Sequence, residues 1–252
     1  MLPRPFFIAM CIMSDCIINP TRSKGDPELP ATGILAVNPA DSSCFSSLAR
    51  RHGLARHAFF HAHLYGNDTF FLAGPAVGAP LAAICLEKLI VLGARRILVY
   101  GWCGSLHPSL VAGDLFIPTG GLSEEGTSNH YPGVAGNDDG ALRLRLIDAL
   151  TGTDGFDRPK QGRIWTTDAV YRETREKVAR YGAQGMLAVD MEYTALRAVA
   201  AFRHVSLDAV MLVSDELFHR DWSPRMHLKR FRSRSRRVLE CLCALIQQGE
   251  IT

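Results

Sequence analysis

The sequence lacks the patterns by which metal sites and disulfide frameworks are usually recognised. It contains neither a CxxC pair nor an HExxH motif, so no zinc or other metal site is indicated. Its seven cysteines are an odd number, and several of them lie inside apolar runs. This usage fits buried, reduced thiols better than a disulfide framework.

A large excess of charge and a membrane-length apolar run are also missing. The net charge of +3 makes no general case for nucleic acid as a partner. The basic run at residues 225–237 is interpreted as the solvated face of a terminal helix. The apolar run at residues 6–13 is far shorter than the roughly 20 residues that span a bilayer, and no clear cleavage site follows it. We therefore expect a cytoplasmic protein that binds neither nucleic acid nor a membrane.

The length and apolar content suit a single domain. A chain of 252 residues with 47% hydrophobic content is long enough for one large α/β domain with a buried core. A cluster of Pro, Gly and charged residues at 20–30 marks a linker, so residues 1–30 are predicted to be an N-terminal extension and residues 31–252 the domain.

Short apolar runs alternate with helical patterns along the domain. Strands are expected at residues 33–37, 58–64, 69–73, 96–100, 114–118 and 207–213, and helices at 80–93, at 141–150 and from about 223. The strands at 58–64 and 69–73 flank a turn-forming tetrad and are predicted to form a hairpin. The order predicts an α/β domain with a central mixed sheet flanked by helices.

Two acidic positions stand out as candidates for chemistry. Glu192 opens a helical pattern, where the free N–H groups stabilise a carboxylate that can accept hydrogen bonds from a vicinal diol. Asp215 follows the strand at 207–213, and ligands of α/β folds bind where strands end, so it is a candidate general acid. Taken singly, each position is equally typical of an ordinary helix start or N-cap.

The order of these positions relative to glycine-rich blocks suggests a family. The blocks are residues 74–80, 101–106, 112–118, 124–128 with Tyr131, and 162–171. Together with the two acidic positions they resemble the nucleoside phosphorylase family, which contains the trimeric and hexameric purine nucleoside phosphorylases, the uridine phosphorylases and the methylthioadenosine nucleosidases. The resemblance runs from about Ile34 to Asp215. It implies a phosphorylase/hydrolase-like fold and cleavage of the N-glycosidic bond of a nucleoside.

The resemblance assigns the sugar and base sides of a site. Glu192 matches the glutamate that holds the ribose hydroxyls, and Met191 matches the methionine that packs against the ribose. Asp215 matches the aspartate that protonates or hydrogen-bonds a purine at N7, and Trp165 lies where hexameric purine phosphorylases stack an aromatic ring on the base. The glycine blocks would add four substrate-binding residues, Val77, Gly78, Cys103 and Gly104.

The base is expected to be a purine. The stretch at 172–176, which reads Arg-Glu-Thr-Arg-Glu, shows no match to the glutamine and arginine by which uridine phosphorylases read uracil.

The phosphate side departs from the family pattern. The family's Gly-Asp-Pro-x-Arg loop is replaced here by residues 38–43, which lack the arginine. Tyr100 stands at the position of the family's second phosphate-binding arginine, and Trp102 replaces a residue that carries a hydroxyl group. Arg56 remains, at a position from which a neighbouring subunit reaches the phosphate. Asp41 is a candidate base for activating water, as in the nucleosidases, although Asp in such a loop is commonly a turn residue.

Three hypotheses follow from these residues. The first is a phosphorylase that transfers the ribosyl group of a purine nucleoside to phosphate as co-substrate. The second is a hydrolytic nucleosidase acting on a purine or 5′-modified nucleoside, and the third is a non-catalytic nucleoside-binding protein. None of them requires a cofactor. The resemblance also implies a homo-oligomer, either a dimer, a trimer or a hexamer.

Overall fold

The computed structural model describes residues 16–60, 62–131 and 140–251. Much of the predicted N-terminal extension lies outside these ranges. Its described part, residues 16–30, forms no helix or strand. This part nevertheless contacts the domain, because Leu29 is buried and its backbone N–H donates to the carbonyl of Leu92 over 2.8 Å.

The described residues form a ten-stranded mixed sheet with helices between the strands. The strands are β1 (Thr32–Ala36), β2 (Ala55–His57), β3 (His63–Gly66), β4 (Phe71–Gly74), β5 (Arg96–Ser105), β6 (Leu115–Ser123), β7 (Lys160–Thr166), β8 (Met186–Asp190), β9 (Ser206–Glu216) and β10 (Ser223–Pro224). The helices are α2 (Ser42–His52), α3 (Ala79–Leu92), α4 (Gly140–Leu150), α5 (Arg175–Ala183), α6 (Tyr193–Arg203) and α7 (Lys229–Gln247). Short 3₁₀ turns are η1 (Pro39–Asp41), η2 (Thr127–His130), η3 (Thr153–Gly155) and η4 (Val170–Arg172). The predicted α/β class and mixed sheet are confirmed.

The sheet closes on itself around β5. The strand order is β10-β9-β6-β7-β8-β5-β1-β4-β3-β2, and β5 also pairs with β9 in parallel. Five strands, β5, β9, β6, β7 and β8, therefore pair in a closed circle. The other four, β1, β4, β3 and β2, continue the sheet outward from β5, and we call them the sheet wing. The cavity described below lies where β5, β8 and β9 end.

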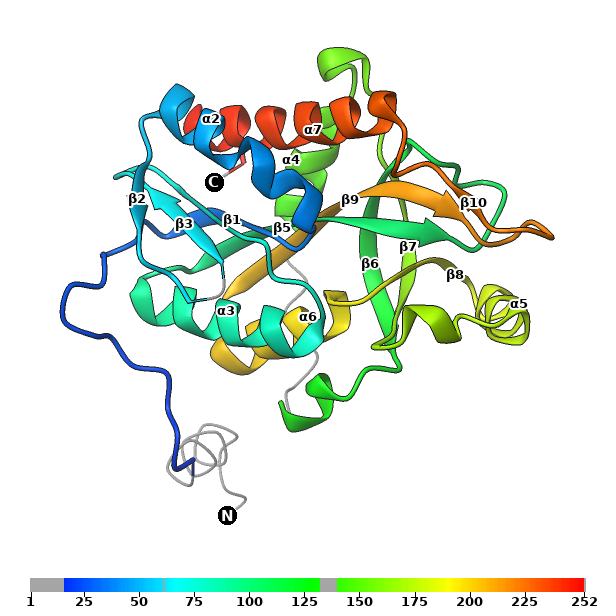
Figure 1. Ribbon diagram of the computed structural model, residues 1–252, viewed down its shortest axis with the longest axis horizontal. Coiled ribbons are helices and arrows are strands. Elements are labelled where there is room, and N and C mark those ends of the chain that lie inside the picture. The colour runs from blue at the N-terminus through cyan, green and yellow to red at the C-terminus, as the bar shows by residue number, and fades with distance from the viewer. Residues whose placement is uncertain (1–15, 61, 132–139, 252) are drawn as a thin grey trace.

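Helices cover both faces of the sheet. Figure 1 shows α2, α4 and α7 on one side and α3 and α6 on the other. Neighbouring residues of a strand point to opposite faces. Accordingly, Val99 packs in the core under α3 and α6, whereas Leu98 and Tyr100 pack in the core under α7. A sheet buried on both faces explains why its strands appear as continuous apolar runs.

A hairpin forms as predicted, by β3 and β4, but the strand predicted at residues 58–64 is wrong over the described residues 58–60 and 62, and the turn lies at residues 67–70 rather than 65–68. The loop begins at Asn67, whose Oδ1 accepts hydrogen bonds from the backbone N–H groups of Thr69 and Phe70. The last helix begins later than predicted, at Lys229 rather than near Ser223. The reason is that residues 223–224 pair with β9 as β10. Among the described residues, no helix has the length and apolar character needed to cross a membrane.

Candidate active site

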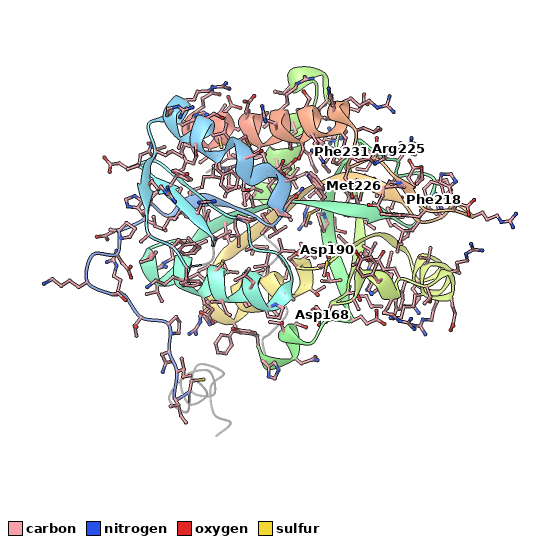
Figure 2. All side chains as sticks on the ribbon, viewed as in Figure 1. Asp168, Asp190, Phe218, Arg225, Met226 and Phe231 are labelled. Atoms are coloured by element: carbon pink, nitrogen blue, oxygen red, sulfur yellow. The ribbon has the colours of Figure 1, made fainter. Side chains whose placement is uncertain are left out.

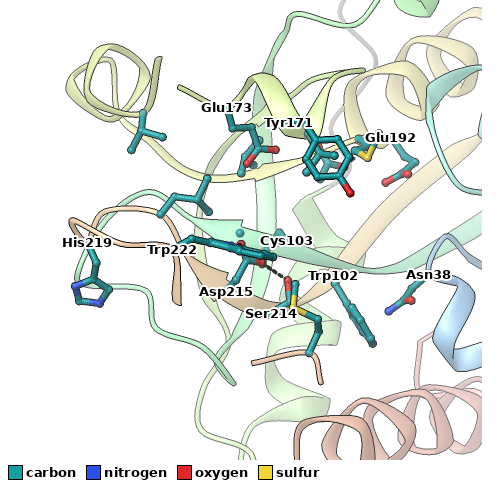
Figure 3. A pocket seen from close by; sticks show the side chains of 18 of the residues that line it. Asn38, Trp102, Cys103, Tyr171, Glu173, Glu192, Ser214, Asp215, His219 and Trp222 are labelled. Atoms are coloured by element: carbon teal, nitrogen blue, oxygen red, sulfur yellow. Dashed lines mark hydrogen bonds between the residues drawn. The ribbon is translucent and has the colours of Figure 1, made fainter. Parts of the chain in front are cut away.

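A cavity of about 520 Å³ opens at the ends of β5, β8 and β9. Its walls come from the segment after β1, the starts of η4 and α6, and the loop between β9 and β10 (Figure 3). Five of the predicted site residues line it: Met191, Glu192, Asp215, Cys103 and Gly104. Segments from distant parts of the sequence therefore meet in one place, as the sequence predicted for the sugar and base sides.

Glu192 is the N-cap residue of α6 and is only 5% exposed. Its Oε1 accepts a hydrogen bond of 2.6 Å from the backbone N–H of Gly78. Burial, followed by the nearby charge of Asp190, raises the pKa of Glu192 to about 8, although the Gly78 N–H favours the ionised form. A carboxyl group in this position can accept hydrogen bonds from sugar hydroxyls.

Asp190 sets the start of the helix that carries Glu192. Its Oδ2 accepts hydrogen bonds from the backbone N–H groups of Glu192 (3.1 Å) and Tyr193 (2.7 Å), and Oδ1 accepts from Thr166 Oγ1 at 2.6 Å. Burial raises the pKa of this carboxyl to about 6. Asp190 lies near the centre of the molecule (Figure 2) and acts as the structural support of the site.

Asp215 lies near the end of β9 and is 8% exposed. Trp222 Nε1 donates to its Oδ2 over 2.8 Å, and Ser214 Oγ donates to its Oδ1 over 2.5 Å. The end of β9 and the residue after it approach β5 closely because residue 104 is glycine: a Cβ there would lie 2.5 Å from Leu217 Cδ1 and 3.3 Å from Asp215 Oδ2. Cys103 also lines the wall, and burial keeps the pKa of its thiol well above the ordinary value.

Glu173 is a cavity residue that was not singled out from the sequence. It follows η4 and faces the cavity close to Asp215 (Figure 3). Burial, and then the charges of Asp215 and Asp190, raise its pKa to about 8. The sequence offered one signal, namely its place two residues after Tyr171 at the end of a family block.

The structure contradicts the base-stacking role predicted for Trp165. Its side chain is fully buried and does not line the cavity. The ring centroid lies 4.7 Å from that of Tyr181, and Nε1 donates to Glu124 Oε2 over 3.0 Å. The alternation of side chains along β7 turns this residue into the small core beside α5. Instead, the aromatic residues at the cavity are Trp102, Tyr171 and Trp222.

The geometry does not support Asp41 as a water-activating base. The carboxylate is buried, does not line the cavity and accepts hydrogen bonds from Ser235 Oγ at 2.9 and 3.1 Å. Desolvation raises its pKa to about 6, although the bond from Ser235 opposes this shift. Ser235 Oγ also accepts from Trp102 Nε1 (2.7 Å) and lies 2.8 Å from the Tyr100 hydroxyl. Asp41 therefore belongs to a buried network that ties β5 and η1 to α7.

The remaining predicted residues lie outside this cavity. Val77 is exposed on the loop before α3, and Gly78, with a φ of 82°, contributes through its N–H to Glu192. Arg56 is exposed on β2, the strand at the end of the sheet wing. Its predicted contact with a neighbouring subunit's site concerns a second copy of the chain and stays a prediction.

The β1 side of the cavity carries no cationic side chain. Its lining residues are Val37, Asn38, Pro39 and Trp102. Asn38 Oδ1 accepts from the backbone N–H of Ala40, and its buried Nδ2 has no hydrogen-bond partner within the described ranges. The same ranges contain no cluster of three His, Cys, Asp or Glu side chains arranged to hold a metal ion.

Comparison with known proteins agrees with this architecture. Over 156 residues the chain is 31% identical to a guanosine phosphorylase of Halorubrum lacusprofundi, covering 61% of this chain and 64% of that protein. It is 28% identical over 200 residues to a DeoD-type purine nucleoside phosphorylase of Bacillus cereus, covering 77% and 80% of the two chains. A purine nucleoside phosphorylase structure from Toxoplasma gondii has the same fold, with a TM-score of 0.70 at 18% identity over 88% of this chain and 93% of the other. Because the sequence model of the phosphorylase superfamily matches residues 35–247, most of its length, the chain belongs to that superfamily.

Proposed function

We propose that the protein cleaves the N-glycosidic bond of a purine nucleoside and transfers the ribosyl group to phosphate. The observation that carries this proposal is the convergence of Glu192 and Asp215, from α6 and β9, on one cavity. The relatives named guanosine phosphorylase and purine nucleoside phosphorylase support the choice of a purine and of phosphate.

The two carboxyl groups suit the charge that develops in this reaction. Breaking the bond builds positive charge on the ribose and negative charge on the departing base. Glu192 accepts hydrogen bonds from the ribose hydroxyls, and these bonds favour its ionised form. The resulting negative charge stabilises the positive charge that develops on the ribose. Asp215 delivers a proton or a hydrogen bond to N7 of the base. Met191 supplies an apolar surface for the ribose.

Glu173 offers a hydrogen-bonding group for the edge of the purine base. With its pKa raised to about 8, the carboxyl is neutral at pH 7 and can both donate and accept. A neutral carboxyl pairs with a 6-oxopurine through two hydrogen bonds, accepting from N1–H and donating to O6. A 6-aminopurine can form the converse pair, accepting the carboxyl proton at N1 and donating from its amino group, so the preference for a 6-oxopurine rests on the relative named guanosine phosphorylase.

Hydrolysis is the second candidate, because the cavity presents no cationic side chain on its β1 side. A phosphate dianion is held most strongly by cationic donors, and neither Asn38 nor Trp102 carries a charge. Phosphorolysis therefore needs a cation from elsewhere.

We propose a homo-oligomer in which the exposed Arg56 of one copy reaches the cavity of the next. The proposed enzyme needs no cofactor or metal and works in the cytoplasm.

Product analysis with the purified protein tests this function. Guanosine, inosine, adenosine and uridine are incubated with and without phosphate, and the released base and sugar are separated and identified. Free base with ribose 1-phosphate, formed only with phosphate and fastest for guanosine or inosine, supports phosphorolysis. Free ribose formed without phosphate establishes the hydrolase. Nucleoside binding without any product overturns both and indicates a binding protein. Asp215→Asn serves as the inactive control.

A further inference from the structure

The loop between β9 and β10 places an indole beside the predicted general acid. β10 returns antiparallel to β9, with Pro224 opposite Asp215. The backbone N–H of Arg225 extends this pairing by donating to the carbonyl of Ser214 over 2.9 Å. Trp222 immediately precedes β10, so the backbone pairing holds its side chain next to Asp215 (Figure 3).

Trp222 makes one defined hydrogen bond to Asp215, whereas most of its indole ring is exposed. Trp222 Nε1 donates to Asp215 Oδ2 over 2.8 Å, yet the residue is 64% exposed and lines the cavity. A large aromatic ring exposed to this degree at a cavity is a feature typical of binding surfaces. The N–H edge is therefore anchored on a buried carboxyl while the ring remains available to a ligand.

The other two tryptophans are held by packing contacts, although Trp102 also lines the cavity. Trp165 is fully buried against Tyr181. Trp102 packs edge-on against Phe231, with ring centroids 4.9 Å apart, and donates its N–H to Ser235. Of the three indoles in the sequence, only that of Trp222 combines a contact to Asp215 with a largely open ring.

We propose that Trp222 is a positioning residue for Asp215 and that its ring is the surface on which the purine base packs. This inference rests on the function proposed above, because it places the base at Asp215. It assigns to Trp222 the stacking role that the sequence had predicted for Trp165.

The hydrogen bonds determine which oxygen of Asp215 carries the proton. An indole N–H can only donate, so it holds Oδ2 as an acceptor and leaves Oδ1 to be protonated. Ser214 Oγ has one proton and a second acceptor within reach, the Cys103 carbonyl at 3.2 Å. When Oδ1 is protonated, the Ser214 hydroxyl donates to that carbonyl instead, which leaves the proton on Oδ1 available to the base.

The same groups stabilise the product state. The proton passes from Oδ1 to the base nitrogen as the glycosidic bond breaks and its electron pair moves to the base. Asp215 is then a carboxylate, to which both Trp222 Nε1–H and the Ser214 hydroxyl donate in the observed geometry. Water returns the proton before the next turnover.

Two substitutions separate the role of the N–H from that of the ring. Trp222→Phe keeps an aromatic ring and removes the donor, so kcat should fall about tenfold, as for the loss of one hydrogen bond to a charged group, with KM changed less than about twofold. Trp222→Leu removes both, so KM should also rise, by about fivefold to tenfold. Ile84→Ala, an exposed apolar change on α3, is the control and should leave both constants unaltered.

Fluorescence gives a readout that does not depend on turnover. Hypoxanthine, a free 6-oxopurine base, should quench tryptophan emission in the wild type and in the Ile84→Ala variant, and the quench should be largely lost in Trp222→Phe. A full quench in Trp222→Phe, or an unchanged kcat in that variant, would overturn the proposal. Equal KM values for the Phe and Leu variants would overturn the role of the ring.

The failure of this inference differs from a failure of the proposed function. If the wild type cleaves no nucleoside, the proposed function fails, and the hypoxanthine quench alone decides whether the base packs on Trp222. If the wild type is active and Trp222→Phe behaves like it, only the role of Trp222 is lost.

Discussion

The backbone N–H of Gly78 donates to Glu192 Oε1 over 2.6 Å, across a separation of 114 residues in the sequence. Gly78 precedes α3 and Glu192 precedes α6, so this bond joins the starts of two helices that pack against each other. The φ of 82° at Gly78 is one that few other residues adopt, which explains a glycine at this place. A family glycine loop therefore acts here by orienting the carboxyl that is proposed to hold the sugar.

Glu192→Gln should lower kcat/KM by about 10- to 100-fold, because an amide cannot ionise as the ribose hydroxyls bind and so cannot oppose the positive charge that develops on the ribose. The midpoint of thermal unfolding should not fall, because a pKa raised to about 8 keeps the buried carboxyl largely protonated at pH 7, so the neutral amide takes the place of a neutral group. Steady-state kinetics and a melting curve check both outcomes. Glu28→Gln, on an exposed side chain, is the matched control. Wild-type turnover by Glu192→Gln would contradict the assigned role.

The free energy of unfolding should fall as the pH rises from about 5 to 8. Glu173 and Glu192 have folded-state pKa values of about 8, against 4.5 for the unfolded chain. The folded state therefore binds more protons over this range, so the stabilisation is complete below about pH 4.5 and is lost as the pH passes through 8. Urea unfolding at pH 5.5 and 8.5 measures the difference. Glu173→Gln should make the pH dependence shallower, and an unchanged slope in that variant would show that Glu173 does not titrate in this range.

Trp165→Phe should destabilise the protein by about 1–3 kcal/mol while leaving KM for the nucleoside within about twofold. The reason is that Trp165 fills a core position against Tyr181 and donates to Glu124, away from the cavity. Chemical unfolding and steady-state kinetics provide the two measurements. A large rise in KM at unchanged stability would restore the stacking role predicted from the sequence.

Ser235→Ala should cost about 2–4 kcal/mol of stability, because it leaves the buried Asp41 carboxylate without its donor and also disrupts the bonds of Tyr100 and Trp102. Ser233→Ala, on the exposed side of the same helix, is the control and should have little effect.

Asp41→Asn, by contrast, should retain turnover, because Asp41 faces α7 and does not line the cavity. Nucleoside cleavage by the purified Asp41→Asn variant, with and without phosphate, measures this. Loss of hydrolysis at unchanged stability in Asp41→Asn would show that the carboxylate activates water after all.

The order of apolar runs and glycine blocks was sufficient to predict the mixed sheet, a hairpin ending in β4, and the strands β1, β4, β5, β6 and β9, whereas β2, β7 and β8 were not predicted. These features depend on local periodicity, which a single sequence displays directly. The positions of Glu192 and Asp215 at the ends of such elements also predicted correctly that both line one cavity. The boundary near Ser223 was wrong because β10 is only two residues long and exists through its pairing with β9.

What the sequence by itself determined is the class of fold, the family and the two carboxyl groups at the site. Only the tertiary structure decided which side chains turn into the cavity. Trp165 and Asp41 face packed interiors, whereas Glu173 and Trp222 come from loops that fold over Asp215. The physical reason is that the direction of a side chain on a short loop depends on contacts that form only in the folded chain. Such contacts leave no periodic mark on the sequence.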